Sequence, residues 1–148
     1  MYQDAPSSFD KNGFYLATGL FDNQTCLLLE KEFDKITNQI KKSGEDINAR
    51  WNSELTNNIE EVGSSVLHTH NVQSYSHKML EMIQDERLID VTESLIGSDI
   101  ILHHTKLFLK PPKKGASFPL HQDWSYFPTK NNSMIAAVVH LSDSHKNM

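Results

Sequence analysis

The sequence has one short segment whose residue types and spacing suit a metal ion, His121-Gln122-Asp123. In an extended chain, side chains two residues apart leave the same face, so the imidazole and the carboxylate can converge on one ion. With a second histidine from elsewhere, such a pair completes the two-histidine, one-carboxylate set that leaves open positions on Fe(II). A His-x-Asp triplet is common by chance, so an ordinary surface loop is the alternative.

Aromatic residues follow the triplet directly. Trp124 and Tyr126 lie next to the candidate ligands, so we expect them to line the mouth of a substrate site. Aromatic side chains bury a large area wherever they fall, so plain core packing is the alternative. We favour core packing for Phe127 and leave Trp124 open.

Helical patterns come first along the chain and supply elements that can position these residues. Between Asn23 and Lys42, four apolar residues recur at the spacing of one helix face, which predicts a helix; they are Leu29, Phe33, Ile36 and Ile40. Asp22 or Asn23 can cap its start. Two shorter amphipathic segments are expected between Ser74 and Ile96, with Asp85 as a cap between them, and both are expected to pack on a sheet.

Strand patterns dominate the second half of the chain. Asp99–Lys110 is rich in β-branched and large apolar residues, which predicts a strand, and Ser133–Leu141 predicts another, buried strand. Gly13–Phe21 suits a short strand or turn, and Ser43–Ser65 suits a polar loop. Helices precede strands, so the expected class is α+β.

Length and charge exclude several classes of protein. A chain of 148 residues suits one domain or part of one. Its 14 Lys and Arg against 19 Asp and Glu give a net charge of −5 without a basic stripe, which argues against nucleic acid as a partner. Cys26 is the single cysteine, so no internal disulfide can form. The first residues contain no apolar run of the kind found in signal peptides or membrane spans, so we expect a cytoplasmic protein without a membrane partner.

The stretch LHHTKLFLKPPKKGASFPLHQDWSYFP, continuing into SMIAAVVHLSD, resembles the phytanoyl-CoA dioxygenase family. NGFYLATGLF, DERLIDVTESLIGSDI and VLHTHNV extend the resemblance over most of the chain. It implies a partial double-stranded β-helix, a jelly-roll relative, with helices packed outside the sheet. It also implies a dioxygenase that hydroxylates a small organic or acyl-CoA-like substrate. The implied cofactors are Fe(II), held by His121 and Asp123, and the cosubstrate 2-oxoglutarate, with ascorbate as a further candidate.

The same resemblance points to residues for the cosubstrate and the substrate. Lys106 on the predicted strand would supply charge to a carboxylate of 2-oxoglutarate, and His70 would supply a hydrogen bond. The alternatives are a solvated edge-strand lysine and a loop histidine. Three loop lysines could meet a phosphate-bearing substrate, although a solvated loop explains them equally well; they are Lys110, Lys113 and Lys114.

The sequence also departs from the family pattern. The resemblance implies a second iron-binding histidine and an arginine for 2-oxoglutarate beyond the last residue, so we expect residues 1–148 to hold the amino-terminal half of a single domain. His140 and His145 are interpreted as ordinary strand-end residues. A non-catalytic β-helix module for metal binding or interaction, and an inactive fragment, are the alternative functions. Substrate identity and oligomeric state stay open.

Overall fold

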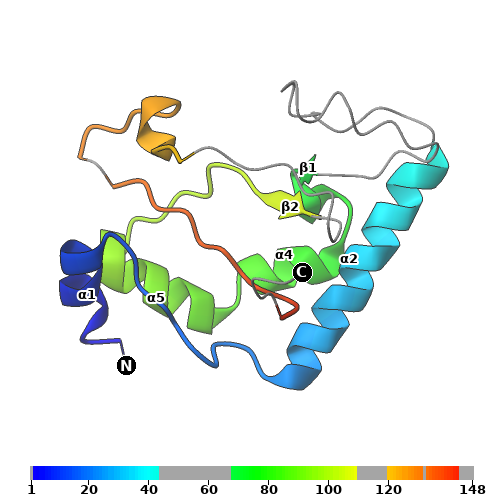
Figure 1. The fold of residues 1–148 in the computed structure, drawn as a ribbon, viewed down its shortest axis with the longest axis horizontal. Helices are drawn as coiled ribbons and strands as arrows, with labels where there is room; N and C mark the ends of the chain where they lie inside the picture. The colour runs from blue at the N-terminus through cyan, green and yellow to red at the C-terminus, as the bar shows by residue number, and fades with distance from the viewer. Residues whose placement is uncertain (1, 44–67, 110–119, 132, 144–148) are drawn as a thin grey trace.

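The structure is a computed structural model that describes residues 2–43, 68–109, 120–131 and 133–143. The elements within these residues are, in chain order, α1 (Ala5–Asn12), α2 (Asn23–Ser43), β1 (His68–His70), the 3-10 turn η1 (Val72–Ser74), α4 (His77–Ile83), α5 (Glu86–Ile96), β2 (Lys106–Phe108) and the 3-10 turn η2 (Asp123–Ser125) (Figure 1). Among the described residues, no helix combines the length and apolar composition needed to cross a bilayer.

The predicted helix at residues 23–42 is confirmed as α2. Its apolar stripe is buried at Leu29, Ile36 and Ile40, as the helical spacing predicts. Asp22 caps the start, because its Oδ1 accepts a hydrogen bond of 2.7 Å from the backbone N–H of Thr25. That hydrogen bond is the main reason why the pKa of Asp22 is lowered.

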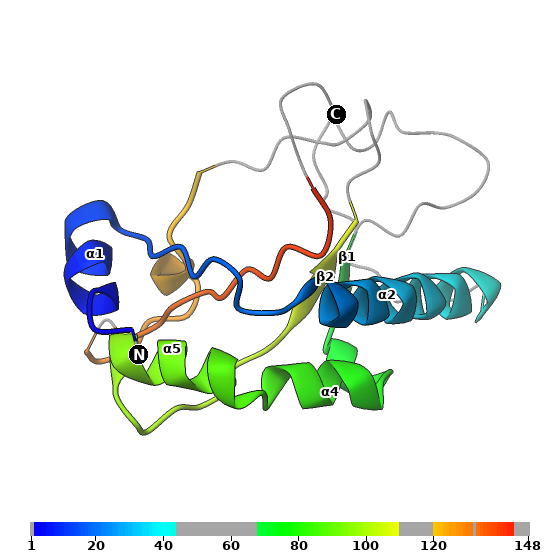
Figure 2. The same ribbon diagram turned by 90° about the horizontal axis from the view of Figure 1, so that it is seen from below.

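The two shorter helices are confirmed as α4 and α5, which lie end to end (Figure 2). Ser76 begins α4 by accepting a hydrogen bond of 3.3 Å from the backbone N–H of Met79. Asp85 begins α5 by accepting one of 3.0 Å from the backbone N–H of Arg87, as predicted. Gly97 follows the last turn of α5 with a positive φ of 90°, a backbone conformation that glycine adopts without strain.

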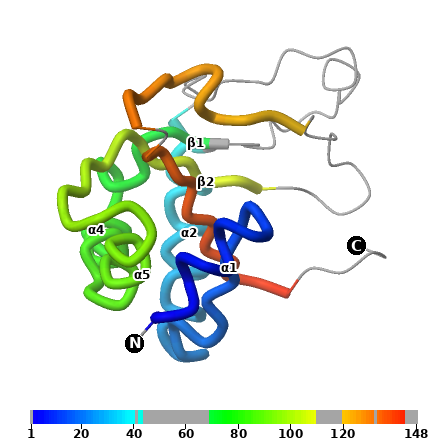
Figure 3. Tube along the Cα trace, turned by 90° about the vertical axis from the view of Figure 1, so that its left-hand side faces the viewer, coloured from blue at the N-terminus to red at the C-terminus, as the bar shows by residue number. Residues whose placement is uncertain are grey.

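One apolar cluster joins the long helix, the short helix and the strand pair. It is formed by Leu29, Ile36, Ile40, Val72, Met79 and Leu107. Figure 3 shows α4 and α5 on one flank of α2, and α4 is in contact with α2. Leu107 brings β2 into the cluster beside Met79, so the prediction of packing on a sheet is met for α4. It is not met for α5, which contributes no residue to this cluster and contacts α1 and α4.

The sheet consists of β1 and β2, which pair antiparallel. His70 lies opposite Lys106 in the register, and Thr69 lies opposite Leu107. Leu107 is buried whereas Lys106 and Phe108 are exposed, so the predicted alternation of faces holds in this strand.

Two strand predictions are wrong: one strand is shorter than predicted, and the other is not found among the described residues. Within Asp99–Lys110 only Lys106–Phe108 is paired, and the described residues of Ser133–Leu141 contain no strand. Apolar and β-branched residues favour extended backbone and burial, but a strand also needs a neighbouring backbone to complete its hydrogen bonds, and composition does not name that neighbour. Gly13–Phe21 forms a turn rather than a strand, and all of the predicted loop Ser43–Ser65 after Ser43, which ends α2, lies outside the described residues.

Candidate functional site

His121 and Asp123 lie side by side and are called here the His121–Asp123 pair. His121 Nε2 is 3.1 Å from Asp123 Oδ1, and both side chains are partly open to solvent. The backbone of Gln122 between them is extended, with φ −112° and ψ 124°. An extended residue places its two neighbours on the same side of the chain, so the convergence predicted from the spacing is confirmed, although Asp123 begins η2 rather than continuing a strand.

The donor atoms of the pair fit a divalent metal ion. Nitrogen and oxygen ligands lie about 2.0–2.2 Å from such ions, so two neighbouring ligands are roughly 3 Å apart, close to the observed separation. A neutral imidazole and a carboxylate are two of the three ligands of the Fe(II) set that leaves positions open. In the part of the chain that the structure describes, no group of three or more potential metal ligands gathers at one point.

The turn after the pair is closed by backbone hydrogen bonds. The carbonyl of Asp123 accepts from the N–H groups of Tyr126 at 2.9 Å and Phe127 at 3.0 Å. The carbonyl of Gln122 accepts from the N–H of Ser125 at 3.1 Å. These bonds fix the backbone of the candidate carboxylate ligand, and none of the residues in η2 is buried.

The two aromatic candidates for the substrate mouth lie at the surface beside the pair. The Tyr126 ring meets the His121 ring edge-on, with 5.9 Å between centroids, and remains 62 % exposed. Trp124 is also exposed, and its indole N–H donates a hydrogen bond of 3.1 Å to the carbonyl of Thr129. Both side chains are therefore outside the core and accessible to a small molecule.

The two cosubstrate candidates form a cross-strand pair. His70 on β1 and Lys106 on β2 are opposite each other in the sheet register. Partial burial lowers the pKa of His70, and the nearby charge of Lys106 lowers it further. The imidazole is thus held neutral next to an exposed ammonium group, which is a suitable arrangement for binding a carboxylate.

Two further histidines, His103 and His104, connect the segment of the His121–Asp123 pair with the cosubstrate candidates. The His104 ring lies 6.1 Å from the His70 ring and 5.3 Å from the Phe127 ring, measured between centroids. Burial lowers the pKa of His104 most, followed by His103, Lys106 and His70, while Asp123 opposes the shift. Each of these four groups is therefore within electrostatic reach of His104.

His103 and His104 are not among the site residues predicted above. The available signal was the His-His doublet inside the predicted strand Asp99–Lys110. Phe127 is half-buried and packs against both imidazoles, but it is not part of the apolar core, so the core packing that we favoured for it is not met. His140 is exposed. His145 and the three loop lysines, Lys110, Lys113 and Lys114, lie outside the described residues.

Comparison with known proteins identifies a family that this chain matches. Residues 9–147 match the family described as phytanoyl-CoA dioxygenase (PhyH). A probable alpha-ketoglutarate-dependent hypophosphite dioxygenase of Stutzerimonas stutzeri is 31 % identical over 78 residues, covering 52 % of this chain and 27 % of that protein. Human peroxisomal phytanoyl-CoA dioxygenase is 26 % identical over 143 residues, covering 90 % of this chain and 41 % of the relative.

An ectoine dioxygenase of Nocardia farcinica is 21 % identical over 142 residues, covering 96 % of this chain and 45 % of the relative. The chain thus spans less than half the length of these relatives. No solved structure gives a significant match. The match over residues 9–147 nevertheless covers nearly the whole chain, which therefore belongs to the phytanoyl-CoA dioxygenase family.

Proposed function

We propose that this chain supplies two Fe(II) ligands, His121 and Asp123, to a 2-oxoglutarate-dependent dioxygenase that hydroxylates a small organic or acyl-CoA-like molecule. The observation that carries the proposal is the 3.1 Å approach of His121 Nε2 to Asp123 Oδ1 in a chain of this family. Bound iron would supply the oxygen chemistry that amino-acid side chains lack. The side chains would bind, orient and shield the reactants.

The His121–Asp123 pair would act through its protonation states. A histidine binds a metal ion only when the ligating nitrogen is unprotonated, and a carboxylate binds it as the anion. Asp123 also brings negative charge to within 3.1 Å of the His121 nitrogen, which favours a cation at this point.

Lys106 and His70 would hold 2-oxoglutarate. Lys106 offers a positive charge to a carboxylate, and His70, held neutral by burial and by Lys106, offers a hydrogen bond. We expect Lys106→Ala to weaken 2-oxoglutarate binding more than Fe(II) binding, since Lys106 cannot be a metal ligand while it is charged. Equal weakening of both would contradict this assignment.

Trp124 and Tyr126 would contact the substrate. Both are exposed next to the His121–Asp123 pair, where an organic molecule must approach to be hydroxylated. By their names, the relatives act on hypophosphite, phytanoyl-CoA and ectoine, all of them small molecules. This range supports a small-molecule substrate without choosing among chemical classes.

The proposed fold is the first part of a double-stranded β-helix in which residues 1–148 belong to one domain. The family match over residues 9–147 supports it, and so does the single apolar cluster shared by α2, α4 and β2. In such a fold the helices lie outside the sheet, which agrees with the position of α2 and α4 against the strand pair.

Anaerobic calorimetric titration with Fe(II) tests the proposal. His121→Ala and Asp123→Ala should each abolish the heat of binding seen with the wild-type chain, because neither side chain chelates without the other. The matched control is His77→Ala, since His77 Nε2 lies at the same 3.1 Å distance from a carboxylate oxygen of Glu81 but on α4. Loss of Fe(II) binding in the control, or its retention in either site variant, would contradict the assignment.

A further inference from the structure

We propose that Phe127 is a positioning residue that fixes the His121–Asp123 pair onto the segment before β2. The proposal rests on the proposed function, since it concerns the same metal site. Phe127 acts through the turn that carries Asp123 and through the imidazoles of His103 and His104.

The first observation is the backbone bond at Phe127. Its N–H donates to the carbonyl of Asp123 at 3.0 Å and so closes the turn that begins at the candidate ligand. This bond ties the position of Phe127 to the backbone of Asp123.

The second observation is that the turn itself lies at the surface. No residue of η2 is buried, and the rings of Trp124 and Tyr126 are 47 % and 62 % exposed. Phe127 is the more enclosed aromatic residue of this segment. Its ring centroid lies 4.6 Å from that of His103 and 5.3 Å from that of His104, within the range of favourable ring contacts.

The third observation is a contact between the two imidazoles on which the Phe127 ring packs. His103 Nδ1 and His104 Nδ1 are 2.5 Å apart, so one nitrogen carries the shared proton and the other accepts it. His104 precedes Lys106 by two residues, and the next residue, Leu107, belongs to the apolar core. The Phe127 ring therefore connects the His121–Asp123 pair to the core and to the cosubstrate candidates.

The consequence is a specific effect on metal affinity. Loss of residues that orient metal ligands typically weakens binding 10- to 100-fold. We expect Phe127→Leu, which keeps the backbone N–H but removes the ring, to weaken Co(II) binding by roughly 10-fold. Co(II) is used as an oxygen-stable stand-in for Fe(II). Phe127→Tyr keeps the ring and should restore the wild-type affinity.

The matched control is Phe14→Leu, the same exchange at a side chain that is 63 % exposed in the loop before α2. Its Co(II) affinity should equal that of the wild type. Thermal unfolding followed by circular dichroism separates positioning from general destabilisation: Phe127→Leu should be fully folded at the temperature of the Co(II) titration and still bind Co(II) more weakly. Weaker binding seen only where Phe127→Leu is partly unfolded, or equal affinities of Phe127→Leu and Phe14→Leu, would overturn the proposal.

A second pair of variants serves if Phe127→Leu fails to fold. His103 is exposed, so its replacement should leave the fold intact. His103→Ala removes one face of the stack and should weaken Co(II) binding, whereas His103→Phe keeps a ring and should not. Equal weakening by both would show that the His103 nitrogen matters rather than ring packing, and would overturn the positioning role. Wild-type chain that binds no Co(II) would contradict the metal site itself.

Discussion

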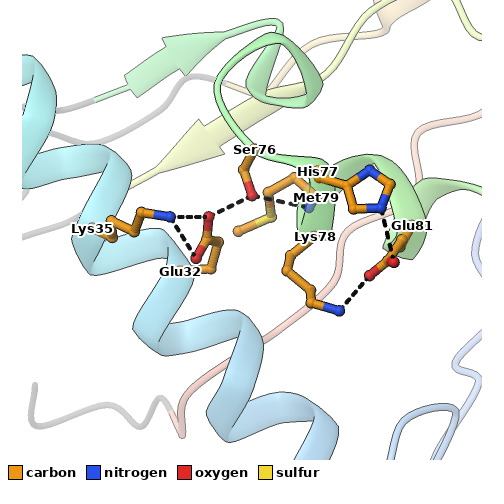
Figure 4. A network of polar contacts seen from close by, with 7 residues as sticks. All are labelled: Glu32, Lys35, Ser76, His77, Lys78, Met79 and Glu81. Atoms are coloured by element: carbon orange, nitrogen blue, oxygen red, sulfur yellow. Dashed lines mark hydrogen bonds and ion pairs between the residues drawn. The ribbon is translucent and has the colours of Figure 1, made fainter.

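Two hydrogen bonds of Ser76 join α2 to α4 and cap α4, and the free energy that each contributes can be estimated (Figure 4). The Ser76 hydroxyl is buried; it donates to Glu32 Oε1 at 2.7 Å and accepts from the N–H of Met79 at 3.3 Å. Ser76→Ala removes a helix cap worth about 1 kcal/mol. It also removes a hydrogen bond to a charged group, worth roughly 1.5–3 kcal/mol.

We take the lower end for that bond because Lys35 still binds Glu32, at 3.1 Å, and because 15 % of the Glu32 side chain remains exposed. The expected loss in unfolding free energy is then about 2–3 kcal/mol. Urea denaturation followed by circular dichroism at neutral pH measures it. Asp22→Ala removes only a cap and should cost about 1 kcal/mol. If Ser76→Ala costs no more than Asp22→Ala, the link between the helices does not stabilise the fold.

The same contact should make stability depend on pH. The hydrogen bond from Ser76, aided by Lys35, lowers the pKa of Glu32 below its ordinary value of 4.5 and outweighs the opposing effect of burial. A carboxyl whose pKa is lowered on folding stabilises the protein above its unfolded pKa, and this contribution is lost as pH falls through the folded pKa. The stability difference between wild type and Glu32→Gln should therefore be constant near neutral pH and shrink below about 4.5. If the difference in unfolding free energy stays constant in acid, the contact with Ser76 and Lys35 does not lower the pKa of Glu32.

Other variants test the core, the sheet and a helix end. Ile36 is fully buried, so Ile36→Ala should cost about 3 kcal/mol of unfolding free energy. Leu28→Ala, at a residue that is 56 % exposed, should change it by less than about 0.5 kcal/mol in the same denaturation assay. Lys106→Ala removes a charge that lowers the pKa of His70, so an NMR titration should show that pKa rising toward 6.5. Gly13 ends α1 with φ 75°, so Gly13→Ala should lower the thermal midpoint, with a cost of roughly 1 kcal/mol.

The helices could be predicted because their signals are local. Each signal lies within a few residues of sequence, and three of them are present in the structure: the apolar stripe that includes Ile36, the cap at Asp22 and the cap at Asp85. The helix α1 was not predicted, although Pro6 near its start and Gly13 after its end are characteristic signals.

The strands could not be predicted because their partners lie far away in sequence. The partner of Lys106–Phe108 is His68–His70, a three-residue strand whose polar sequence carries no strand pattern. The residues of Ser133–Leu141 have the composition of a strand but no paired neighbour among the described residues. The His121–Asp123 pair was predictable because both residues lie on one side of a single extended residue. The stack of His103, His104 and Phe127 was not, since it depends on a tertiary contact.

NMR of the imidazole groups during Co(II) addition shows whether His121 and Asp123 together bind a divalent cation. Of the eight histidines in the chain, His121 should show the largest paramagnetic effect, and Asp123→Asn should reduce that effect strongly. His77 is the internal reference, because its ring is equally close to a carboxylate on α4. If the largest paramagnetic effect falls on His77, or if the effect at His121 is unchanged in Asp123→Asn, the two residues do not bind the cation together.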